Sequence, residues 1–353
     1  MVRYRRESRR AFQGGVSFVK VNDIGEFGLI SRLTLPLASG DSRIVKGVGD
    51  DTAVFRHGSD RLLLATTDAQ IEGIHFTKDG FSPEQIGKRA AAVNLSDIAA
   101  MGGRPLFALV SLATPEDTPV EWLERIYAGL IYEFKREGVE IIGGNTAELP
   151  ERLLLDITLL GEVDEAGLLC RDGAQVGDLL CVTGELGRSA AGLVLQSQPS
   201  LIEDKELVES ARLAHAVPRP RLREGAILGH TGKITSCIDI SDGVLGDARH
   251  IARQSGVTVE IELRDLPVAE EARLVSAKIG KDFRVFALTG GEDFELMFTL
   301  QAKSVSEVFA RLQKATDCSP RVIGRIRPGE GNVRVTENGR QRTVSENGYR
   351  HFL

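Results

Sequence analysis

The alternation of short apolar segments with longer amphipathic segments constrains this fold more than any other feature of the sequence. The apolar runs predict strands at residues 61–67, 106–113, 139–142, 153–163, 179–183, 234–239, 257–263, 295–300 and 321–326. The amphipathic segments predict helices at residues 83–101, 120–136, 189–196, 218–228, 243–254, 268–279 and 305–315. Strands and helices that alternate along a chain pack as sheets covered by helices. We therefore predict an α/β or α+β fold.

Capping and turn residues mark several ends of these segments. Ser82 is a favourable N-cap, Pro83 occupies the first helical position, and Gly102-Gly103 follow the end of the same helix. The Asn338-Gly339 pair lies in the middle of residues 333–344 and is typical of a tight hairpin turn. The chain is therefore expected to finish with a β-hairpin.

The length of 353 residues predicts two domains, at roughly 100–200 residues per domain. Residues 164–178 are polar and rich in glycine, which places the boundary between domains at 25–163 and 164–353. Residues 1–24 contain five closely spaced arginines and are predicted to be a disordered basic tail, because like charges repel and bury nothing. The ordered part then begins with a short amphipathic helix at residues 29–33.

Composition excludes several classes of protein. A net charge of −6 without an internal basic stripe argues against nucleic acid as a partner. Apolar runs such as residues 106–113 are far shorter than the roughly 20 residues of a membrane span, so no membrane association is expected. The four cysteines show no C-x-x-C spacing and predict neither a zinc site nor a disulfide framework. A reducing cytoplasm suits such a chain.

Acidic residues recur where a predicted strand ends or where glycine interrupts the chain. They are Asp50, Asp51, Asp68, Asp97, Asp239, Asp242, Glu292 and Asp293. Carboxylates gathered in one place repel one another and resist burial unless cations neutralise them. Magnesium suits such ligands, because it prefers hard oxygen atoms and takes one or two carboxylates together with substrate phosphates. Phosphoryl transfer needs mainly positioning and charge neutralisation, which a site without an obvious nucleophile can supply.

Each of these motifs also has a purely structural interpretation. Asp50-Asp51 after glycine is commonly a turn, and Ser241-Asp242-Gly243 before a helix can be a simple cap. His75 can be a packed histidine, Arg171 a surface ion pair, and residues 290–293 a turn. No single motif decides between these alternatives.

The complete set of motifs, in order, resembles the thiamine-monophosphate kinases. The motifs are GEFGLI (25–30), GVGDD (47–51), TTDAQIEGIHF (66–76), AVNLSDIAAMGGRP (92–105), GGNT (143–146), RDGAQVGD (171–178), DISDGVLGD (239–247), GGEDFELMFT (290–299) and GYRHF (348–352). The resemblance implies two sheet-plus-helix domains of the aminoimidazole-ribonucleotide synthetase type. It also implies a homodimer formed by the N-terminal sheets, and ATP- and magnesium-dependent phosphorylation of thiamine phosphate to thiamine diphosphate.

The resemblance further implies roles for individual residues. The implied magnesium ligands, several ions being held, are Asp51, Thr66, Thr67, Asp68, Asp97, Asn145, Asp239 and Asp242. The implied ATP contacts are the Gly143-Gly144 turn, Asn145, Arg171 and Ser241. The implied contacts to thiamine phosphate are His75, Glu292 and Glu346. The reaction implied is direct in-line transfer without a phosphoenzyme.

Two of these positions depart from the family pattern. Asn145 stands where the GGDT motif has a magnesium-binding aspartate, so one negative charge is missing and weaker magnesium binding is expected. Glu346 stands where the family usually has tryptophan, and a carboxylate offers no aromatic face to the thiamine rings. Two alternatives follow: another ATP-dependent enzyme of the same superfamily, or a non-catalytic relative that binds nucleotide or thiamine diphosphate.

Overall fold

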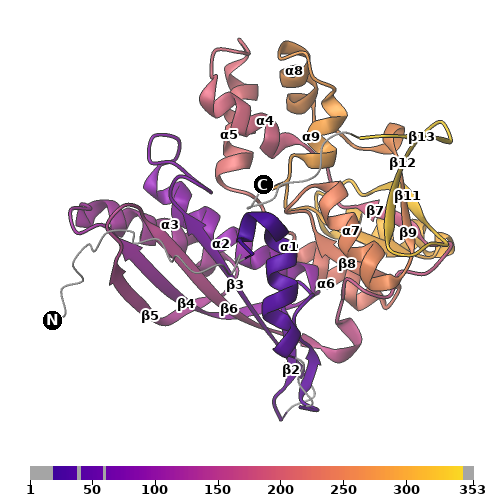
Figure 1. The fold of residues 1–353 in the computed structure, drawn as a ribbon, viewed down its shortest axis with the longest axis horizontal. Helices are drawn as coiled ribbons and strands as arrows, with labels where there is room; N and C mark the ends of the chain where they lie inside the picture. Colours follow the sequence, from indigo (N-terminus) through magenta and orange to yellow (C-terminus); the bar gives the residue numbers. More distant parts are fainter. Residues whose placement is uncertain (1–18, 38–40, 59–60, 345–353) are drawn as a thin grey trace. The chain divides into compact units, whose positions relative to one another are not determined.

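A computed structural model describes residues 19–37, 41–58 and 61–344, and the chain separates into two compact units. One unit comprises residues 1–38 and 350–353, and the other comprises residues 39–349. The described part of the smaller unit is helix α1 (Val21–Thr34) followed by a 3-10 turn (Leu35–Leu37) (Figure 1). The predicted helix at residues 29–33 is therefore present, but it starts earlier and is kinked at Gly25, which has φ 63°.

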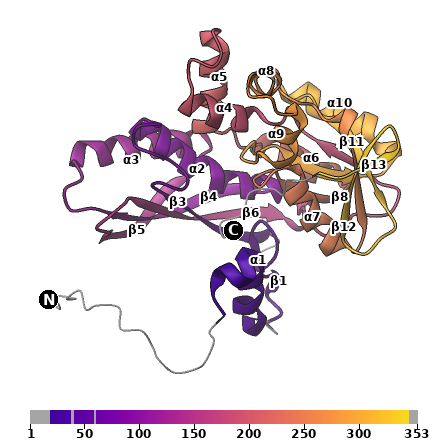
Figure 2. The ribbon, with the colours of Figure 1, turned by 45° about the horizontal axis from the view of Figure 1, so that its top comes forward.

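The first half of the larger unit forms a six-stranded sheet. Its strands are β1 (Ile44–Lys46), β2 (Ala53–Arg56), β3 (Arg61–Ile71), β4 (Arg104–Thr114), β5 (Glu140–Glu148) and β6 (Leu154–Asp164). They lie in the order β1-β2-β3-β6-β4-β5, and the β4–β5 pair is parallel while the other pairs are antiparallel. Helices α2 (Pro83–Ala100) and α3 (Val120–Arg136) cover one face of this sheet (Figure 2).

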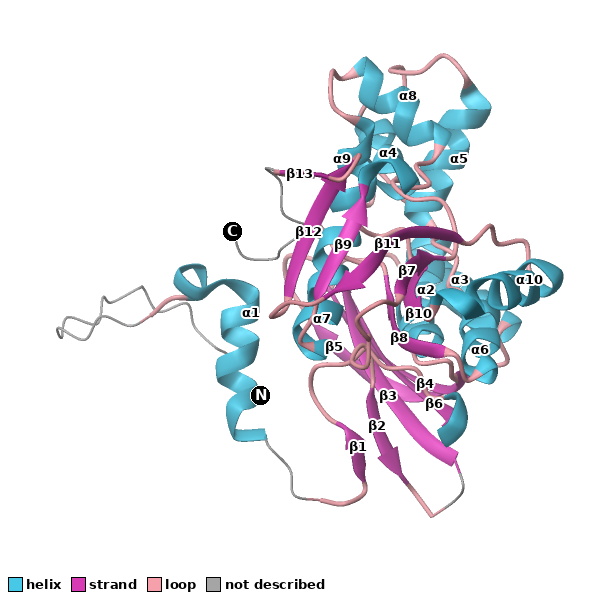
Figure 3. Ribbon diagram, turned by 90° about the vertical axis from the view of Figure 1, so that its right-hand side faces the viewer, coloured by secondary structure: helices cyan, strands magenta, loops and turns pink. Residues whose placement is uncertain are grey.

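The second half forms a seven-stranded sheet, in the order β13-β12-β9-β11-β7-β10-β8 (Figure 3). Its strands are β7 (Leu179–Val182), β8 (Ile234–Asp239), β9 (Thr258–Glu262), β10 (Leu296–Leu300), β11 (Arg321–Arg327), β12 (Asn332–Glu337) and β13 (Arg340–Arg342). Its helices are α4 (Arg188–Ser197), α5 (Lys205–Ala216), α6 (Leu222–Thr231), α7 (Val244–Ser255), α8 (Glu270–Lys278), α9 (Phe283–Thr289) and α10 (Val305–Ala315).

Helix α2 joins the two halves, because it is buried almost all round. Its small residues let neighbouring backbone approach closely, as at Gly87 beside Ile126 and at Ala99 beside Gly225. The core around α2 continues from the first sheet to side chains of the second sheet such as Phe298, whereas Met297, the next residue toward the N-terminus, faces a second core. A helix that is buried on nearly all sides lies between two layers, and the polar residues that it buries need partners there. Residues of α2 can therefore reach both halves of the site.

The predicted elements are mostly confirmed, with three kinds of correction. Strand β3 continues through Asp68 to Ile71, so Asp68 does not mark a strand end. Strand β5 continues through Gly143-Gly144, which are therefore not a turn. A Cβ on Gly144 would lie 1.9 Å from the carbonyl oxygen of Val110, so glycine is needed for the close β4–β5 pairing. Strands β1 and β2 and helix α9 were not predicted, because their segments are short. Helix α5 was not predicted either, although its segment is amphipathic.

The hairpin prediction is confirmed. Strands β12 and β13 pair antiparallel, and Asn338 and Gly339 between them adopt φ 53° and φ 73°, as a type I′ turn requires. None of the helices in the described part of the chain has the length and apolar character that crossing a bilayer needs. All four cysteines are free thiols.

Candidate active site

Three carboxylates that are distant in sequence meet at the junction of the two sheets. Asp51 precedes β2, Asp97 lies in the last turn of α2, and Asp239 ends β8. One oxygen from each of these residues lies within 4.8 Å of the others. We call Asp51, Asp97 and Asp239 the acidic cluster. The fold thus brings together three of the predicted magnesium ligands.

Neighbouring side chains hold the acidic cluster in place. The Arg171 guanidinium donates from Nη2 to Asp51 Oδ1 at 2.5 Å, and the Ser96 hydroxyl donates to Asp239 Oδ2 at 2.6 Å. The Thr66 hydroxyl donates to Asp97 Oδ2. In contrast, Asp51 Oδ2 is buried and has no hydrogen-bond partner within the described chain. Arg171 is therefore part of the site, not a surface ion pair.

Crowding raises the pKa of several of these acids. Burial, and then the negative charge of Asp51, raise the pKa of Asp239 to about 8. Burial and repulsion from Asp68, Asp239 and Asp51 raise the pKa of Asp97 well above its usual range. Asp68 reaches solvent but is largely surrounded by protein, which together with Asp156 and Asp51 raises its pKa to about 6. Such acids give up their protons most readily when a cation replaces them.

The acidic cluster fits a magnesium ion by the chemistry of its donors. It offers hard oxygen atoms from converging carboxylates, and the buried Asp51 Oδ2 lacks a partner. Magnesium ordinarily keeps several waters and binds substrate phosphate with its remaining positions, so three carboxylates leave room for both. The geometry therefore supports a cation at this junction.

Successive side chains of strand β3 point to opposite faces of the sheet, so the predicted ligands Thr66, Thr67 and Asp68 do not all lie on one face. The Thr66 side chain reaches Asp97 on α2, so Thr66 and Asp68 point toward the acidic cluster. Thr67 points to the opposite, exposed face, where its hydroxyl donates to Asp156 Oδ1 at 3.1 Å. Within one copy of the chain, Thr67 therefore lies on a different face of the sheet from Asp97.

Asn145 lies on this same exposed face. It pairs with Ser111, which pairs in turn with Asp156, and Asp156 pairs with Ala69 of β3. Three interstrand steps correspond to about 14 Å between β5 and β3. Gly143 and Gly144 precede Asn145 on β5, so all three predicted ATP contacts on β5 are remote from the acidic cluster of the same chain.

The loop after β8 carries Ser241 and Asp242 into helix α7. Gly243 precedes the helix with φ 94°, a conformation that favours glycine. The backbone N–H of Asp242 donates to Asp247 Oδ2 at 3.2 Å, and the Ser241 carbonyl accepts the N–H of Glu292 at 2.7 Å. This loop therefore links the acidic cluster to Glu292.

The two remaining predicted substrate contacts in the described chain, His75 and Glu292, come from different halves of the unit. His75 follows β3, and its Nδ1 accepts the N–H of Ile71 at 3.0 Å. Glu292 follows α9 and lines a cavity of about 500 Å³ in the second half. Glu346 and the GYRHF motif lie outside the described residues.

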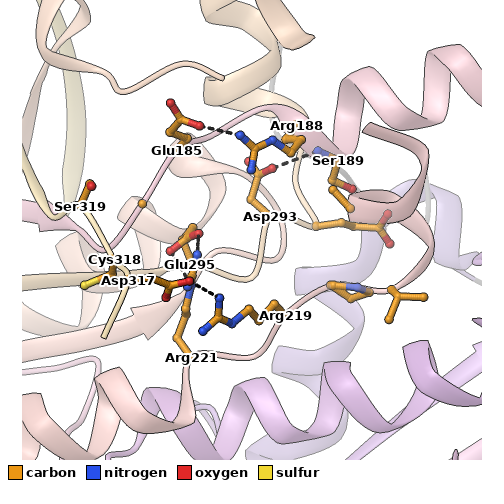
Figure 4. Close-up of a pocket in the computed structure, with 15 residues that line it drawn as sticks. Glu185, Arg188, Ser189, Arg219, Arg221, Asp293, Glu295, Asp317, Cys318 and Ser319 are labelled. Carbon is orange, nitrogen blue, oxygen red and sulfur yellow. Dashed lines mark hydrogen bonds and ion pairs between the residues drawn. The ribbon is translucent and has the colours of Figure 1, made fainter. Parts of the chain in front are cut away.

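The cavity beside Glu292 has strongly charged walls (Figure 4). Arg221 pairs with Glu295, Arg219 pairs with Asp317 at 2.6 Å, and Arg188 pairs with Glu185 at 2.6 Å. Asp293 accepts backbone N–H groups of Gly187 and Ser189 at the start of α4. The cavity can therefore surround a polar or charged organic group.

Sequence reasoning did not identify several residues of this region. Asp156 is the one acid within residues 154–161, the apolar first part of strand β6, and this isolated position was a usable signal. Asn94, whose Oδ1 accepts the N–H of Asp68, and Ser96 lie within the AVNLSDIAAMGGRP motif, in which only Asp97 is a predicted ligand. Arg89 and His215 contact Glu292, but only the fold reveals this, because they are far apart in sequence.

The sequence matches two family models in the same order as the two sheets. Residues 49–163 match AIR synthase related protein, N-terminal domain, and residues 175–336 match AIR synthase related protein, C-terminal domain. A solved structure of hydrogenase maturation protein HypE has a TM-score of 0.66 at 19% identity, covering 88% of this chain and 94% of that one, and so shares the fold. The fold and the acidic cluster thus define a two-domain protein of the AIR synthase type.

More similar relatives specify the family within this class. The thiamine-monophosphate kinase of Aquifex aeolicus (strain VF5) is 37% identical over 339 residues, which cover 95% of this chain and 100% of the relative. The structure "AaThiL complexed with AMPPCP and TMP" has a TM-score of 0.82 at 35% identity, and covers 95% of this chain and 99% of that one. The chain belongs to the thiamine-monophosphate kinase family.

Proposed function

We propose that this protein transfers the γ-phosphate of ATP to thiamine monophosphate and so forms thiamine diphosphate. Membership of the family over nearly the whole chain supports this reaction, as does the related structure with AMPPCP and TMP. The observation that carries the proposal is the acidic cluster, in which Asp51, Asp97 and Asp239 converge beside Arg171. Such a site suits phosphorylated ligands accompanied by cations.

Asp51, Asp97 and Asp239 would hold magnesium, with Asp68 beside them. When bound, magnesium would neutralise the carboxylates and the phosphate oxygens of ATP, which would otherwise repel one another. Arg171 offers a fixed guanidinium next to Asp51 and can bind a phosphate oxygen. Asp242 stays as a further proposed ligand. Thr67 and Asn145 lie on the other face of the sheet, so they are proposed to hold a separate ion and not the one at the acidic cluster.

The acceptor needs no strong general base. A phosphate monoester has a second pKa of about 6, so the attacking oxygen of thiamine monophosphate is already ionised near neutral pH. The protein's task is therefore to place that oxygen in line with the γ-phosphorus and to exclude water. Glu292 and His75 are proposed to contact the acceptor from the two halves of the site.

A homodimer is proposed to form through the exposed face of the first sheet. That face carries Phe107, Leu109 and Ile142 with 41%, 40% and 56% of their surface exposed. A second copy of this chain would cover these apolar side chains and the face that bears Asn145 and Thr67. Light scattering after size exclusion should give twice the chain mass, and replacing Leu109 by Arg should give a monomer.

The direct test is to incubate pure protein with ATP, magnesium and thiamine monophosphate, and to measure thiamine diphosphate by mass spectrometry. Omission of magnesium and replacement of Asp97 by Asn should each abolish the product. Other phosphate monoesters serve as competing acceptors. Equal turnover of all acceptors would refute thiamine monophosphate as the substrate. Tight ligand binding without turnover would instead indicate a non-catalytic relative.

A further inference from the structure

Arg89 is a fully buried arginine on helix α2, with 1% of its surface exposed. It lies eight residues before Asp97 on the same helix, which corresponds to about 12 Å along the helix axis. A buried guanidinium is stable only when its charge and its N–H donors are compensated. The partners of Arg89 therefore show what this residue is built to do.

Arg89 reaches from the first half of the unit into the second. Its Nε donates to Gln70 Oε1 at 3.0 Å, its Nη1 donates to the carbonyl oxygen of His215 at 2.6 Å, and its Nη2 donates to Glu292 Oε1. Only Glu292 among these three partners carries a negative charge. The planar guanidinium thus ties one carboxylate oxygen to a rigid helix that also carries a residue of the acidic cluster.

Glu292 is held in an unusual conformation. Its φ of 58° is uncommon for a residue with a side chain, and its N–H is fixed by the Ser241 carbonyl. Its second oxygen, Oε2, lies 3.3 Å from His215 Nδ1, and its side chain is 31% exposed while it lines the cavity. His215 Nδ1 also lies 3.0 Å from the Ser189 hydroxyl. Glu292 is therefore clamped but still accessible to a ligand.

The clamp determines which chemistry Glu292 can offer. Burial alone would raise the pKa of Glu292, but Arg89 and His215 outweigh burial and hold the pKa at about 2. An ionised carboxylate only accepts hydrogen bonds. The group that Glu292 recognises must therefore be an N–H or O–H donor or a cation, and thiamine carries both an amino group and a positive charge.

We propose that Arg89 is a positioning residue for the acceptor substrate, acting through Glu292. This inference rests on the proposed function, in which Glu292 contacts thiamine monophosphate. Arg89 fixes Glu292 Oε1, so that Oε2 is aimed at the ligand, and α2 sets the separation between this carboxylate and the acidic cluster. A purely structural link between the two halves would make the same contacts but would not affect the two substrates differently.

The test measures the KM of each substrate in wild type, Arg89→Met, Glu292→Gln and the double variant. Loss of a charged hydrogen bond should raise the KM for thiamine monophosphate about 10- to 100-fold in each single variant, with the KM for ATP changed by less than about 2-fold. Because both residues act as one unit, the double variant should be no more than about 2-fold worse than the poorer single variant.

Two further variants control for stability. Arg284→Met removes an arginine that pairs with two carboxylates, Asp282 and Glu337, neither of which lines the cavity, so it should lower the melting temperature without changing either KM. Arg89→Lys keeps the charge but loses the planar fork that donates to Glu292 and to the His215 carbonyl from two separate nitrogens, so we expect about a 3- to 10-fold rise in the KM for thiamine monophosphate. This variant decides the question if Arg89→Met does not fold.

Three results would overturn the inference: an unchanged KM for thiamine monophosphate in either Arg89 variant, a parallel rise in both KM values, or independent effects that multiply in the double variant. Failure of the proposed function looks different, because the wild-type protein itself would then make no thiamine diphosphate.

Discussion

Replacement of Asp239 by Asn should flatten the pH dependence of stability in the metal-free protein. The pKa of Asp239 is raised from 3.8 to about 8, chiefly by burial and then by Asp51. The folded state therefore binds a proton more tightly than the unfolded chain does. The stabilisation that comes from the bound proton on Asp239 is fully present below about pH 4 and is lost as the pH rises from about 4 to about 8.

The magnitude follows from linkage. One proton held by the folded state and not by the unfolded state changes the free energy of unfolding by about 1.4 kcal/mol per pH unit. As the pH rises from 5 to 7, the free energy of unfolding of the wild type should thus fall by about 3 kcal/mol more than that of Asp239→Asn. Asn can still accept the hydrogen bond that the Ser96 hydroxyl gives to Asp239, so packing changes little.

The assay is urea unfolding followed by circular dichroism, in the presence of EDTA, at several pH values. Asp79→Asn, which removes an exposed carboxylate, is the matched control and should keep the wild-type slope. Magnesium at 100 times its dissociation constant should raise the free energy of unfolding of the wild type by about 2.7 kcal/mol. It should stabilise Asp239→Asn less, so the wild type should then be the more stable of the two proteins. Parallel pH profiles for wild type and Asp239→Asn would refute the argument that crowding in the acidic cluster raises this pKa.

Three other substitutions test separate parts of the structure. Asn145→Asp restores a carboxylate and should lower the magnesium concentration for half-maximal activity, whereas an unchanged titration would dismiss Asn145 as a ligand position. Gly144→Ala places a Cβ 1.9 Å from the Val110 carbonyl oxygen and should cost about 1–3 kcal/mol in urea unfolding, so wild-type stability would contradict the close strand approach. Arg171→Lys loses the planar guanidinium that donates to Asp51 Oδ1 and to the Gly49 carbonyl from two separate nitrogens, and it should raise the KM for ATP about 10-fold. An unaltered KM would show that Arg171 does not bind nucleotide.

Local pattern was enough to predict most of the elements in this chain. The helices predicted at residues 120–136 and 305–315 have the bounds that the structure shows, because strong amphipathic periodicity and clear ends determine them. Helix α5 was not predicted, although its sequence gives local signals: Asp204 caps it, and its amphipathic residues pack against α4. The predicted strand at residues 139–142 is shorter than β5, because paired glycines normally indicate a turn. Here Gly144 instead allows the backbone of strand β4 to approach closely.

The sequence by itself determined which residues can bind cations and phosphates, because the ordered set of acidic and glycine-rich motifs is visible without coordinates. Only the tertiary structure decided which of them meet. It placed Asp51, Asp97 and Asp239 together, turned Thr67 and Asn145 to the other face of the sheet, and joined Arg89 to Glu292 across 203 residues. The physical reason is that periodicity and turn chemistry act between near neighbours in the chain, whereas a site is assembled by packing between elements that are far apart in sequence.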